Sequence, residues 1–324
     1  MANYGLGRLL FEDRVNSPND EERAKRVENA LFYFSQALET PFNRRDYPMM
    51  YALICIYMAR LFRDRAFLIS HRNFLHDRST PSESLQYGID QGSEALPLYS
   101  ANRAFPVENA ICLLELGYLT VLLLDLPEHC EDNSLREQAI GYLERALAIT
   151  AEIQESVTYK DQNGKAIKWH PGDVKSFPKH VRHLLDNFNF AYLEGCAYYL
   201  LGRVEESWNF NTSIEYSEGD KAYHRRQAFD HLNLCVKPKY LTQDCDLWGD
   251  AHHRLALLII KFPTLVDDEY DVDERGIPYS DLYLEIATSH LILALRCKTL
   301  KKQVRMDCNF HLAQTYITKL QFII

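Results

Sequence analysis

The sequence predicts an all-α protein, a right-handed α-solenoid of about five helical hairpins with one small β-hairpin insertion. Three observations predict this fold class. Small and large apolar residues recur at helical spacing, segment 35–53 aligns without gaps on the segment 58 residues later, and aromatic–proline pairs end the connecting loops. Hydrophobic residues make up 47% of the 324 residues, which is ample for a buried core. We expect a single domain over residues 1–324.

The most frequent pattern is a stripe of small, large and small residues spaced four and three apart. Such a stripe occupies one face of a helix and lets a neighbouring helix approach closely. The first helix is expected to begin at Ser17-Pro18-Asn19-Asp20, which combines a cap, a proline and an acid. The stripe occurs at Ala30, Phe34 and Ala37, at Gly88, Gly92 and Ala95, at Ala139, Leu143 and Ala146, and at Ala287, Leu291 and Ala294.

Helix starts are marked by two further signals. Proline fixes φ for the first turn of a helix, so we expect helices to begin at the aromatic–proline pairs. Capping boxes at 80–83 and 134–137 predict two more starts, on the far side of insertions near 65–80 and 126–133. The aromatic–proline pairs are Tyr47-Pro48, Phe105-Pro106 and Phe177-Pro178.

Residues 187–220 contain the clearest single unit. Gly195 in mid-helix allows close helix packing, and Leu201-Gly202 is expected to end that helix with a left-handed glycine cap. Glu205 and Glu206 are then expected to open the next helix. This spacing resembles one tetratricopeptide repeat, a helical hairpin of about 34 residues. First-type helices, meaning the first helix of each hairpin, are expected to be centred on Ala59, Gly117, Gly195, Ala256 and Ala313.

Two stretches depart from the repeat. Residues 155–176 contain two short alternating runs around Asn163-Gly164, which predicts a β-hairpin that leans on the helices through Trp169. The stretch 221–246 carries another stripe and either adds one helix or shifts the register. That stripe is Ala228, Leu232 and Cys235.

Composition excludes several classes of function. The net charge of −9 without a long basic run argues against a nucleic acid partner. Eight cysteines scattered without a C-x-x-C pair indicate a reducing compartment. The apolar stretch 111–124 is too short to span a membrane, and Glu115 interrupts it, so it predicts a buried helix. We therefore expect a cytoplasmic protein without membrane insertion.

The sequence lacks a convincing catalytic or metal-binding pattern, so we expect no enzyme activity and no cofactor. His252-His253 and the pair His180 and His183 supply too few ligands for zinc. Segment 271–282 fails as a calcium loop at its fifth and twelfth positions. Residues 169–173 place a histidine near an acid, but proline and glycine there indicate a turn.

The resemblance to tetratricopeptide repeats implies that first-type helices line a concave groove. We expect the groove to bind a protein or peptide that is acidic or aromatic-rich, with arginines favouring an acidic segment and aromatic residues acting as anchors. The alternative is that an extra helix or the β-hairpin fills the groove. The residues expected to bind a partner are Arg60, Arg63, Tyr118, Asn189, Tyr192, Tyr199, Asp250, His253, Phe310 and Gln314.

Two biological roles fit such a groove. The first is a scaffold or adaptor that holds partner proteins and is part of a larger complex. The second is a regulatory domain of a signalling protein or enzyme whose other domains lie outside this chain. The apolar stretch 320–324 follows a helix without a second-type partner, so we expect either a longer natural chain or a partner that covers this end.

Overall fold

The computed structural model describes residues 2–39, 42, 44–72, 79–102, 105–156, 159–160, 166–167, 190–208, 217–238, 240–241, 245–266 and 281–323. The chain splits into two compact units, unit 1 (Met1–Phe188) and unit 2 (Asn189–Ile324). The expectation of a single domain over residues 1–324 stays a prediction.

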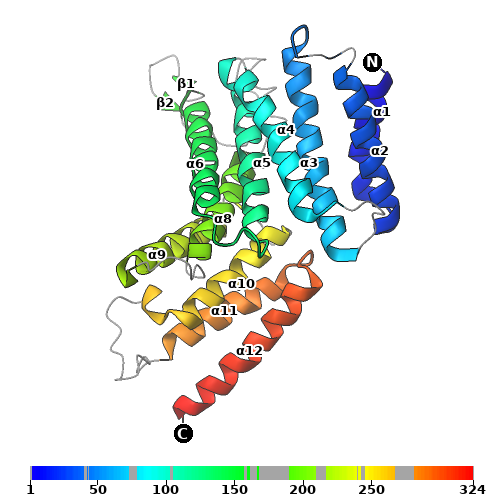
Figure 1. Ribbon diagram of the computed structural model, residues 1–324. Coiled ribbons are helices and arrows are strands. Elements are labelled where there is room, and N and C mark those ends of the chain that lie inside the picture. Colours follow the sequence, from blue (N-terminus) through cyan, green and yellow to red (C-terminus); the bar gives the residue numbers. More distant parts are fainter. Residues whose placement is uncertain are drawn as a thin grey trace. The chain divides into compact units, whose positions relative to one another are not determined.

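Unit 1 is built from helices that pack in consecutive pairs: α1 with α2, α3 with α4, and α5 with α6 (Figure 1). Its elements are α1 (Ala2–Asp13), the 3-10 turn η1 (Arg14–Asn16), α2 (Asp20–Glu39), α3 (Pro48–Arg72), α4 (Pro81–Ala101), α5 (Pro106–Leu124), α6 (Asn133–Ser156), β1 (Tyr159–Lys160) and β2 (Ala166–Ile167). The all-α class is confirmed. Helix α1 was not expected from the sequence, and α3 extends into the stretch predicted as an insertion at 65–80.

Unit 2 continues the pairing, with α8 against α9 and α10 against α11, while α12 packs mainly on α11. Its elements are α8 (Phe190–Ser207), α9 (Glu218–Cys235), α10 (Asp246–Lys261), the 3-10 turn η4 (Pro263–Leu265), α11 (Leu282–Arg296) and α12 (Lys302–Ile323). The centres predicted for the first-type helices fall on α3, α5, α8, α10 and α12, which confirms that these positions are helical.

The starts of the helices follow from local chemistry. Helices α3 and α5 begin at the prolines of the aromatic–proline pairs, as expected. Thr80 and Glu83 form the complete capping box at the start of α4. Two expected caps are wrong by two positions each, because Asn19 rather than Ser17 caps α2 and Asp132 rather than Ser134 caps α6. In both cases an Asx oxygen accepts the orphan N–H of the first turn.

The small–large–small stripes form the core between the paired helices. Ala30, Phe34 and Ala37 of α2 are fully buried. At the crossing of α5 and α6, a Cβ added to Gly117 would lie 2.6 Å from Leu143 Cδ2. The missing side chain therefore lets the two helices touch. The stripes of α6 and α11 are likewise fully buried, at Ala139, Leu143, Ala146, Ala287, Leu291 and Ala294.

Gly202 does not end a helix. Helix α8 runs through it and on to Ser207, so the predicted left-handed cap and the predicted helix start at Glu205 are wrong. A Cβ on Gly202 would lie 2.7 Å from Leu232 Cγ in α9. Gly202 is therefore a contact glycine, meaning a glycine whose missing side chain lets a neighbouring helix pack closely. Helix α9 is the second helix of this hairpin, and its stripe Ala228, Leu232 and Cys235 is buried.

The stretch that follows α9 has a packing role as well. Leu241 is buried, and a Cβ added to Gly195 would lie 2.9 Å from Leu241 Cδ2. Gly195 is therefore the second contact glycine of α8. The stretch 221–246 thus contributes the hairpin partner of α8 and a loop that packs on α8, rather than an additional inserted helix.

Strands β1 and β2 pair antiparallel, with Tyr159 opposite Ile167 and Lys160 opposite Ala166. The turn at Asn163-Gly164 and Trp169 lie outside the described residues, as does the rest of the segment 168–176. Helix α5 is long and apolar enough to cross a membrane by composition, but 67% of its most apolar window is buried inside the structure. It is the core helix that the sequence predicted for 111–124.

Candidate functional site

The residues expected to line a groove do not share one environment. Arg60, Arg63 and Tyr118 lie together on α3 and α5 of unit 1. Tyr192, Phe310 and Gln314 of unit 2 are exposed. Tyr199, at 3% exposure, and His253, at 7%, are buried, so their expected exposure is wrong. Asp250 is half-buried, and Asn189 lies outside the described residues.

Arg60 and Arg63 share one buried carboxylate. Arg60 Nε lies 3.3 Å from Glu115 Oε2, and Arg63 Nη1 lies 2.6 Å from Glu115 Oε1. The Glu115 side chain is only 6% exposed, whereas those of Arg60 and Arg63 are 31% and 23% exposed. The arginines therefore stand between the buried acid and solvent. Arg63 also lies over the Tyr118 ring, 4.7 Å from its centroid.

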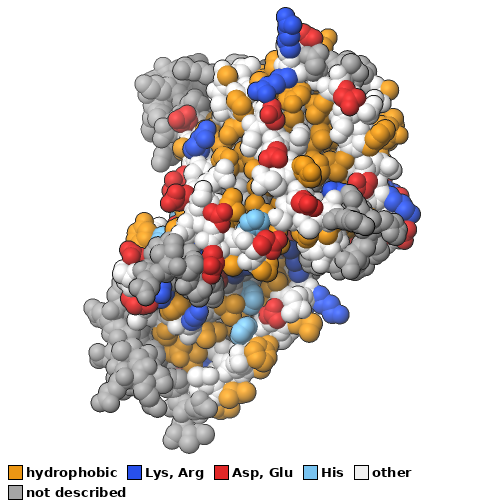
Figure 2. Space-filling view, in the orientation of Figure 1, with side chains coloured by type: hydrophobic (Ala, Val, Ile, Leu, Met, Phe, Trp, Pro, Cys, Tyr) orange, Lys and Arg blue, Asp and Glu red, His pale blue; other side chains and the backbone are white. Residues whose placement is uncertain are grey.

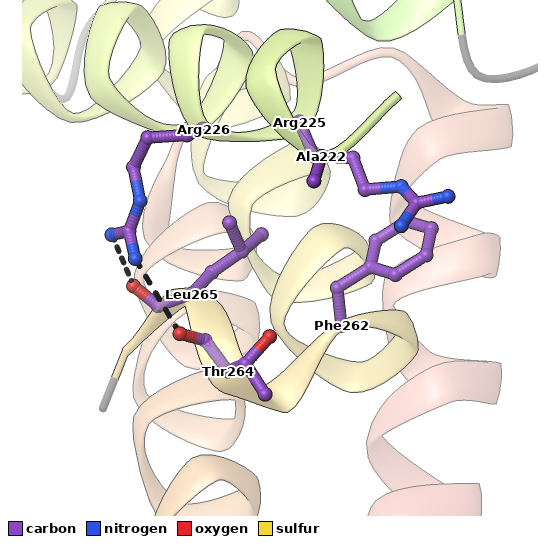
Figure 3. Close-up of a pocket in the computed structure, with 6 residues that line it drawn as sticks. All are labelled: Ala222, Arg225, Arg226, Phe262, Thr264 and Leu265. Atoms are coloured by element: carbon purple, nitrogen blue, oxygen red, sulfur yellow. Dashed lines mark hydrogen bonds between the residues drawn. The ribbon is translucent and has the colours of Figure 1, made fainter. Parts of the chain in front are cut away.

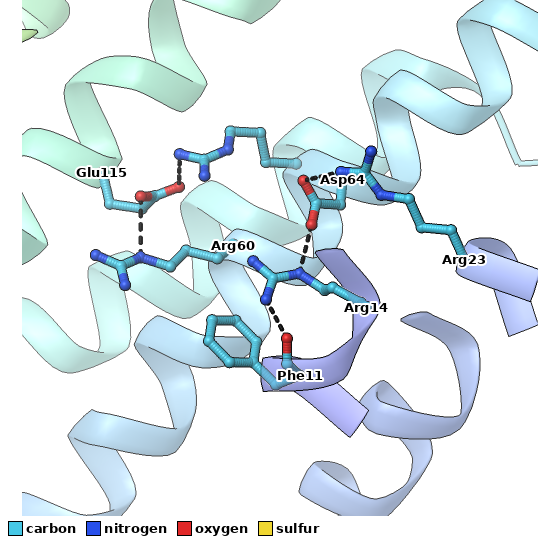
Figure 4. A network of polar contacts seen from close by, with 7 residues as sticks. Phe11, Arg14, Arg23, Arg60, Asp64 and Glu115 are labelled. Atoms are coloured by element: carbon cyan, nitrogen blue, oxygen red, sulfur yellow. Dashed lines mark hydrogen bonds and ion pairs between the residues drawn. The ribbon is translucent and has the colours of Figure 1, made fainter. Parts of the chain in front are cut away.

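A second carboxylate, which lies in α3, is also shared by two arginines. Asp64 binds Arg14 Nε at 2.6 Å and Arg23 Nη2 at 3.2 Å (Figure 4). Arg14 also donates to the Phe11 carbonyl and lies over the Phe11 ring. These contacts tie η1 and α2 to α3.

We name these six charged residues the arginine cluster: Arg14, Arg23, Arg60, Arg63, Asp64 and Glu115. It contains four arginines and two acids. Burial alone would lower the pKa of Arg63, but the neighbouring Glu115, Tyr118 and Asp64 outweigh burial and raise it. Because Asp64 acts on Arg63 as well, the two groups are electrostatically one cluster. It carries an excess of positive charge.

The cluster continues toward α1 through Tyr57 of α3. Burial raises the pKa of the Tyr57 hydroxyl, whose other neighbours include Tyr4, Arg8 and Arg60. Arg8 is exposed and pairs with Glu12 at 2.8 Å. Helices α1, α3 and α5 therefore place arginine and tyrosine side chains on neighbouring positions of unit 1.

Unit 2 contains a separate polar network at the equivalent helices. The Tyr199 hydroxyl donates to Asp250 Oδ2 at 2.6 Å, and Arg254 binds Asp250 at 2.8 Å and Glu206 at 2.6 Å. Burial would raise the pKa of Asp250, but the charge of Arg254 and the hydrogen bond from Tyr199 lower it to about 2. This network links α8 to α10 and uses the groups that were expected to face a ligand.

Histidines of unit 2 form buried contacts. His252 and His290 join α10 to α11 through a 2.7 Å contact between their Nδ1 atoms. Burial lowers the pKa of His252 to about 3 and that of His290 to about 4, and the proximity of His290 adds to the effect on His252. Both rings are thus held neutral at physiological pH. Among the described residues, no group of three or more His, Cys, Asp or Glu side chains is arranged to hold a metal ion.

A small cavity of about 240 Å³ lies between α9 and η4 (Figure 3). Arg226 Nη1 donates to the Leu265 carbonyl at 2.8 Å. Arg225 lies 4.2 Å from the Phe262 ring centroid and pairs with Glu218. Both arginines are engaged in holding η4 against α9, so this cavity is a weaker candidate than the arginine cluster.

Sequence reasoning missed most of the arginine cluster. It identified Arg60 and Arg63 but assigned no role to Arg14, Arg23 or Asp64. The signal that could have revealed this pairing was Glu115, a carboxylate within the apolar run that follows the first turn of α5. A charge in that setting is expected to be paired.

Comparison with known proteins adds little. No family model matches the sequence, and no curated protein matches it. Among solved structures, the nuclear import adaptor Nro1 from S. pombe is similar over 96% of this chain and 98% of its own, at 14% sequence identity and a TM-score of 0.35. A likeness at that level carries no argument about fold or function.

Proposed function

We propose that this chain is a protein–protein interaction module and that the arginine cluster of unit 1 binds an acidic segment of a partner protein. The observation that carries the proposal is the sharing of two buried carboxylates by four arginines, of which Arg23, Arg60 and Arg63 are partly exposed. The fourth, Arg14, is buried. A role in holding proteins together, as a scaffold or adaptor in the cytoplasm and without catalysis, is part of the proposal.

The chemistry of arginine supports an acidic ligand. Each guanidinium has five N–H donors in a planar fork that matches a carboxylate. Glu115 takes up one N–H each from Arg60 and Arg63 and fixes both side chains on α3. Because their position is fixed before binding, little side-chain entropy is lost when a second carboxylate arrives. The Tyr118 ring packs against the Arg63 guanidinium and offers an aromatic contact beside it.

The architecture supports binding of an extended or helical segment. Consecutive hairpins whose buried stripes share one pattern fit a right-handed, tetratricopeptide-like solenoid. In such a solenoid the first-type helices form one continuous surface, and α3 and α5 are first-type helices in contact with each other. The arginine cluster lies on these two helices together with η1 and α2.

The test is affinity capture from native lysate with the full chain, followed by mass spectrometry. Arg60→Met keeps the length of the side chain and leaves Arg63 paired with Glu115, so the fold should persist. The matched control is Arg44→Met, which removes an exposed arginine paired with Glu94 away from the cluster. We expect a set of proteins with acidic segments that Arg60→Met loses and Arg44→Met retains.

Arg60→Lys provides a graded variant, because lysine keeps the charge but not the planar fork. It should capture the same proteins at reduced yield. Equal capture by all four proteins would contradict the proposal, provided that circular dichroism shows the same helicity for each. Captured proteins without acidic segments would contradict it as well.

A further inference from the structure

Helix α12 carries an exposed apolar stripe. Its members are spaced four, three, four and three residues apart, and we name them the α12 outer face: Met306, Phe310, Ala313, Ile317 and Leu320. Phe310 and Ile317 are each 60% exposed. Hydrophobic side chains line α12 in the lower part of Figure 2. The opposite side of the helix, with Cys308 and Thr315 buried, is the side that packs on the rest of unit 2.

This spacing indicates what kind of structure fits the face. Apolar residues alternating at intervals of three and four form the seam by which one α-helix packs along another. A strand or an irregular peptide has a different period and would not match it. The face is therefore shaped for a helix.

The other hairpins of the chain show how such a helix is oriented. Ala59, Gly117 and Ala256 hold the place in α3, α5 and α10 that Ala313 holds in α12, and all three are buried. Each of those helices is covered by the second helix of its hairpin, and Leu143 of α6 fills the space at Gly117. Ala313 is exposed instead. The corresponding occupant runs antiparallel to α12 and places a large apolar residue over Ala313.

The charges beside the outer face define the occupant further. Lys298, Lys301 and Lys302 are exposed at the N-terminal end of α12. The acid of α12, Asp307, is half-buried and accepts a hydrogen bond from Gln303. An antiparallel helix ends beside these lysines, and both its negative C-terminal dipole and acidic residues in its last turn complement them.

We infer that the α12 outer face docks an amphipathic helix of a partner protein, antiparallel to α12 and acidic in its last turn. The apolar seam, the internal hairpins and the lysines each point to this occupant. The inference is independent of the arginine cluster, which lies in unit 1.

The probe for this site is a fluorescein-labelled synthetic peptide with the sequence of residues 133–156. It contains a second-type stripe around Leu143 and two acids, Glu152 and Glu155, near its C-terminus. Fluorescence anisotropy with the full chain should show saturable binding. Ile317→Asp places a carboxylate in the apolar seam and should weaken binding by roughly ten-fold or more. The control Leu9→Asp changes an equally exposed apolar residue in α1 and should leave binding unchanged.

Two further measurements test orientation and occupant. Replacing Glu152 and Glu155 of the peptide by glutamine, or the three exposed lysines of the chain by glutamate, should weaken binding by roughly three-fold or more. Absence of saturable binding, or equal binding by the Ile317→Asp chain, would overturn the inference. So would a dimer of the wild-type chain in sedimentation equilibrium that Ile317→Asp dissociates, because the occupant would then be a second copy. Circular dichroism of the Ile317→Asp chain verifies its fold.

Discussion

Replacing Gly202 by alanine should destabilise unit 2, and the size of the effect follows from one contact. The added Cβ would lie 2.7 Å from Leu232 Cγ and 2.9 Å from Leu232 Cδ2. Leu232 is fully buried, so it cannot swing away. Overpacking of this kind costs about 1–3 kcal/mol. Alanine gains about 1 kcal/mol over glycine in helix propensity, so the net loss should be about 1 kcal/mol.

A double-mutant cycle separates this contact from the alternative of a helix cap. Leu232→Ala removes the obstructing atoms, and in that background Gly202→Ala should stabilise the protein by about 1 kcal/mol. The expected coupling between the two sites is therefore about 2 kcal/mol. A left-handed cap would instead make alanine unfavourable in both backgrounds.

The assay is urea unfolding followed by circular dichroism. Gly141→Ala is the matched control, because Gly141 lies within α6 and a Cβ there would meet nothing within 4 Å. That change should raise stability by up to about 1 kcal/mol. Equal effects of Gly202→Ala in the presence and absence of Leu232 would refute the assignment of Gly202 as a contact glycine.

Three other changes have defined outcomes. Glu115→Ala should lower the free energy of unfolding by about 3 kcal/mol in urea titrations, because it leaves its arginines partly buried without their shared acid; an unchanged midpoint would contradict this. His252 and His290 have lowered pKa values of about 3 and 4 in the folded protein, so as the pH falls the unfolded chain takes up protons at a higher pH than the folded chain does. Stability should thus fall from pH 6.5 downward, by about 2 kcal/mol per histidine at pH 5, and His252→Gln should reduce this slope in thermal melts. Tyr199→Phe removes a buried hydrogen bond to Asp250 and should cost about 1–2 kcal/mol by the same melts, whereas an exposed hydroxyl would cost nothing measurable.

The fold was predictable where the signal is local and periodic. The stripe Ala30, Phe34 and Ala37 is spaced for one helix face, and all three side chains are fully buried. Pro48 and Pro106 begin helices because proline suits the first turn wherever it occurs. These features depend on neighbouring residues alone, so the sequence is sufficient to place them.

The remaining features depend on residues that are distant in the chain. A glycine after leucine suits both a cap and a close contact, and only Leu232 in the next helix decides the role of Gly202. Helical periodicity places Tyr199 on the same face of α8 as Tyr192, yet Tyr199 is buried and Tyr192 is 46% exposed. The hydroxyl of the buried Tyr199 donates a hydrogen bond to Asp250 in α10. Substituting Tyr199 is thus a test of stability, whereas Tyr192 can be changed on the surface.

In the candidate site, too, the local spacing was predictable and the contacts with residues distant in the chain were not. The spacing around Ala59 predicted that Arg60 and Arg63 share a face, and they do share Glu115. The acid itself lies 52 and 55 residues away from them along the chain. Its pairing required the packing of α5 on α3, which no local pattern encodes.

The central claim is that the arginine cluster binds acidic protein segments. The most direct measurement is the dissociation constant of an acidic segment, taken from a captured protein, for the wild-type chain and for Arg60→Met at matched salt. The account predicts that Arg60→Met weakens binding by about ten-fold, consistent with the loss of one charge-assisted pair. It also predicts that added salt weakens binding to the wild-type chain more than to the variant. Equal dissociation constants for the two chains at low salt would contradict the claim.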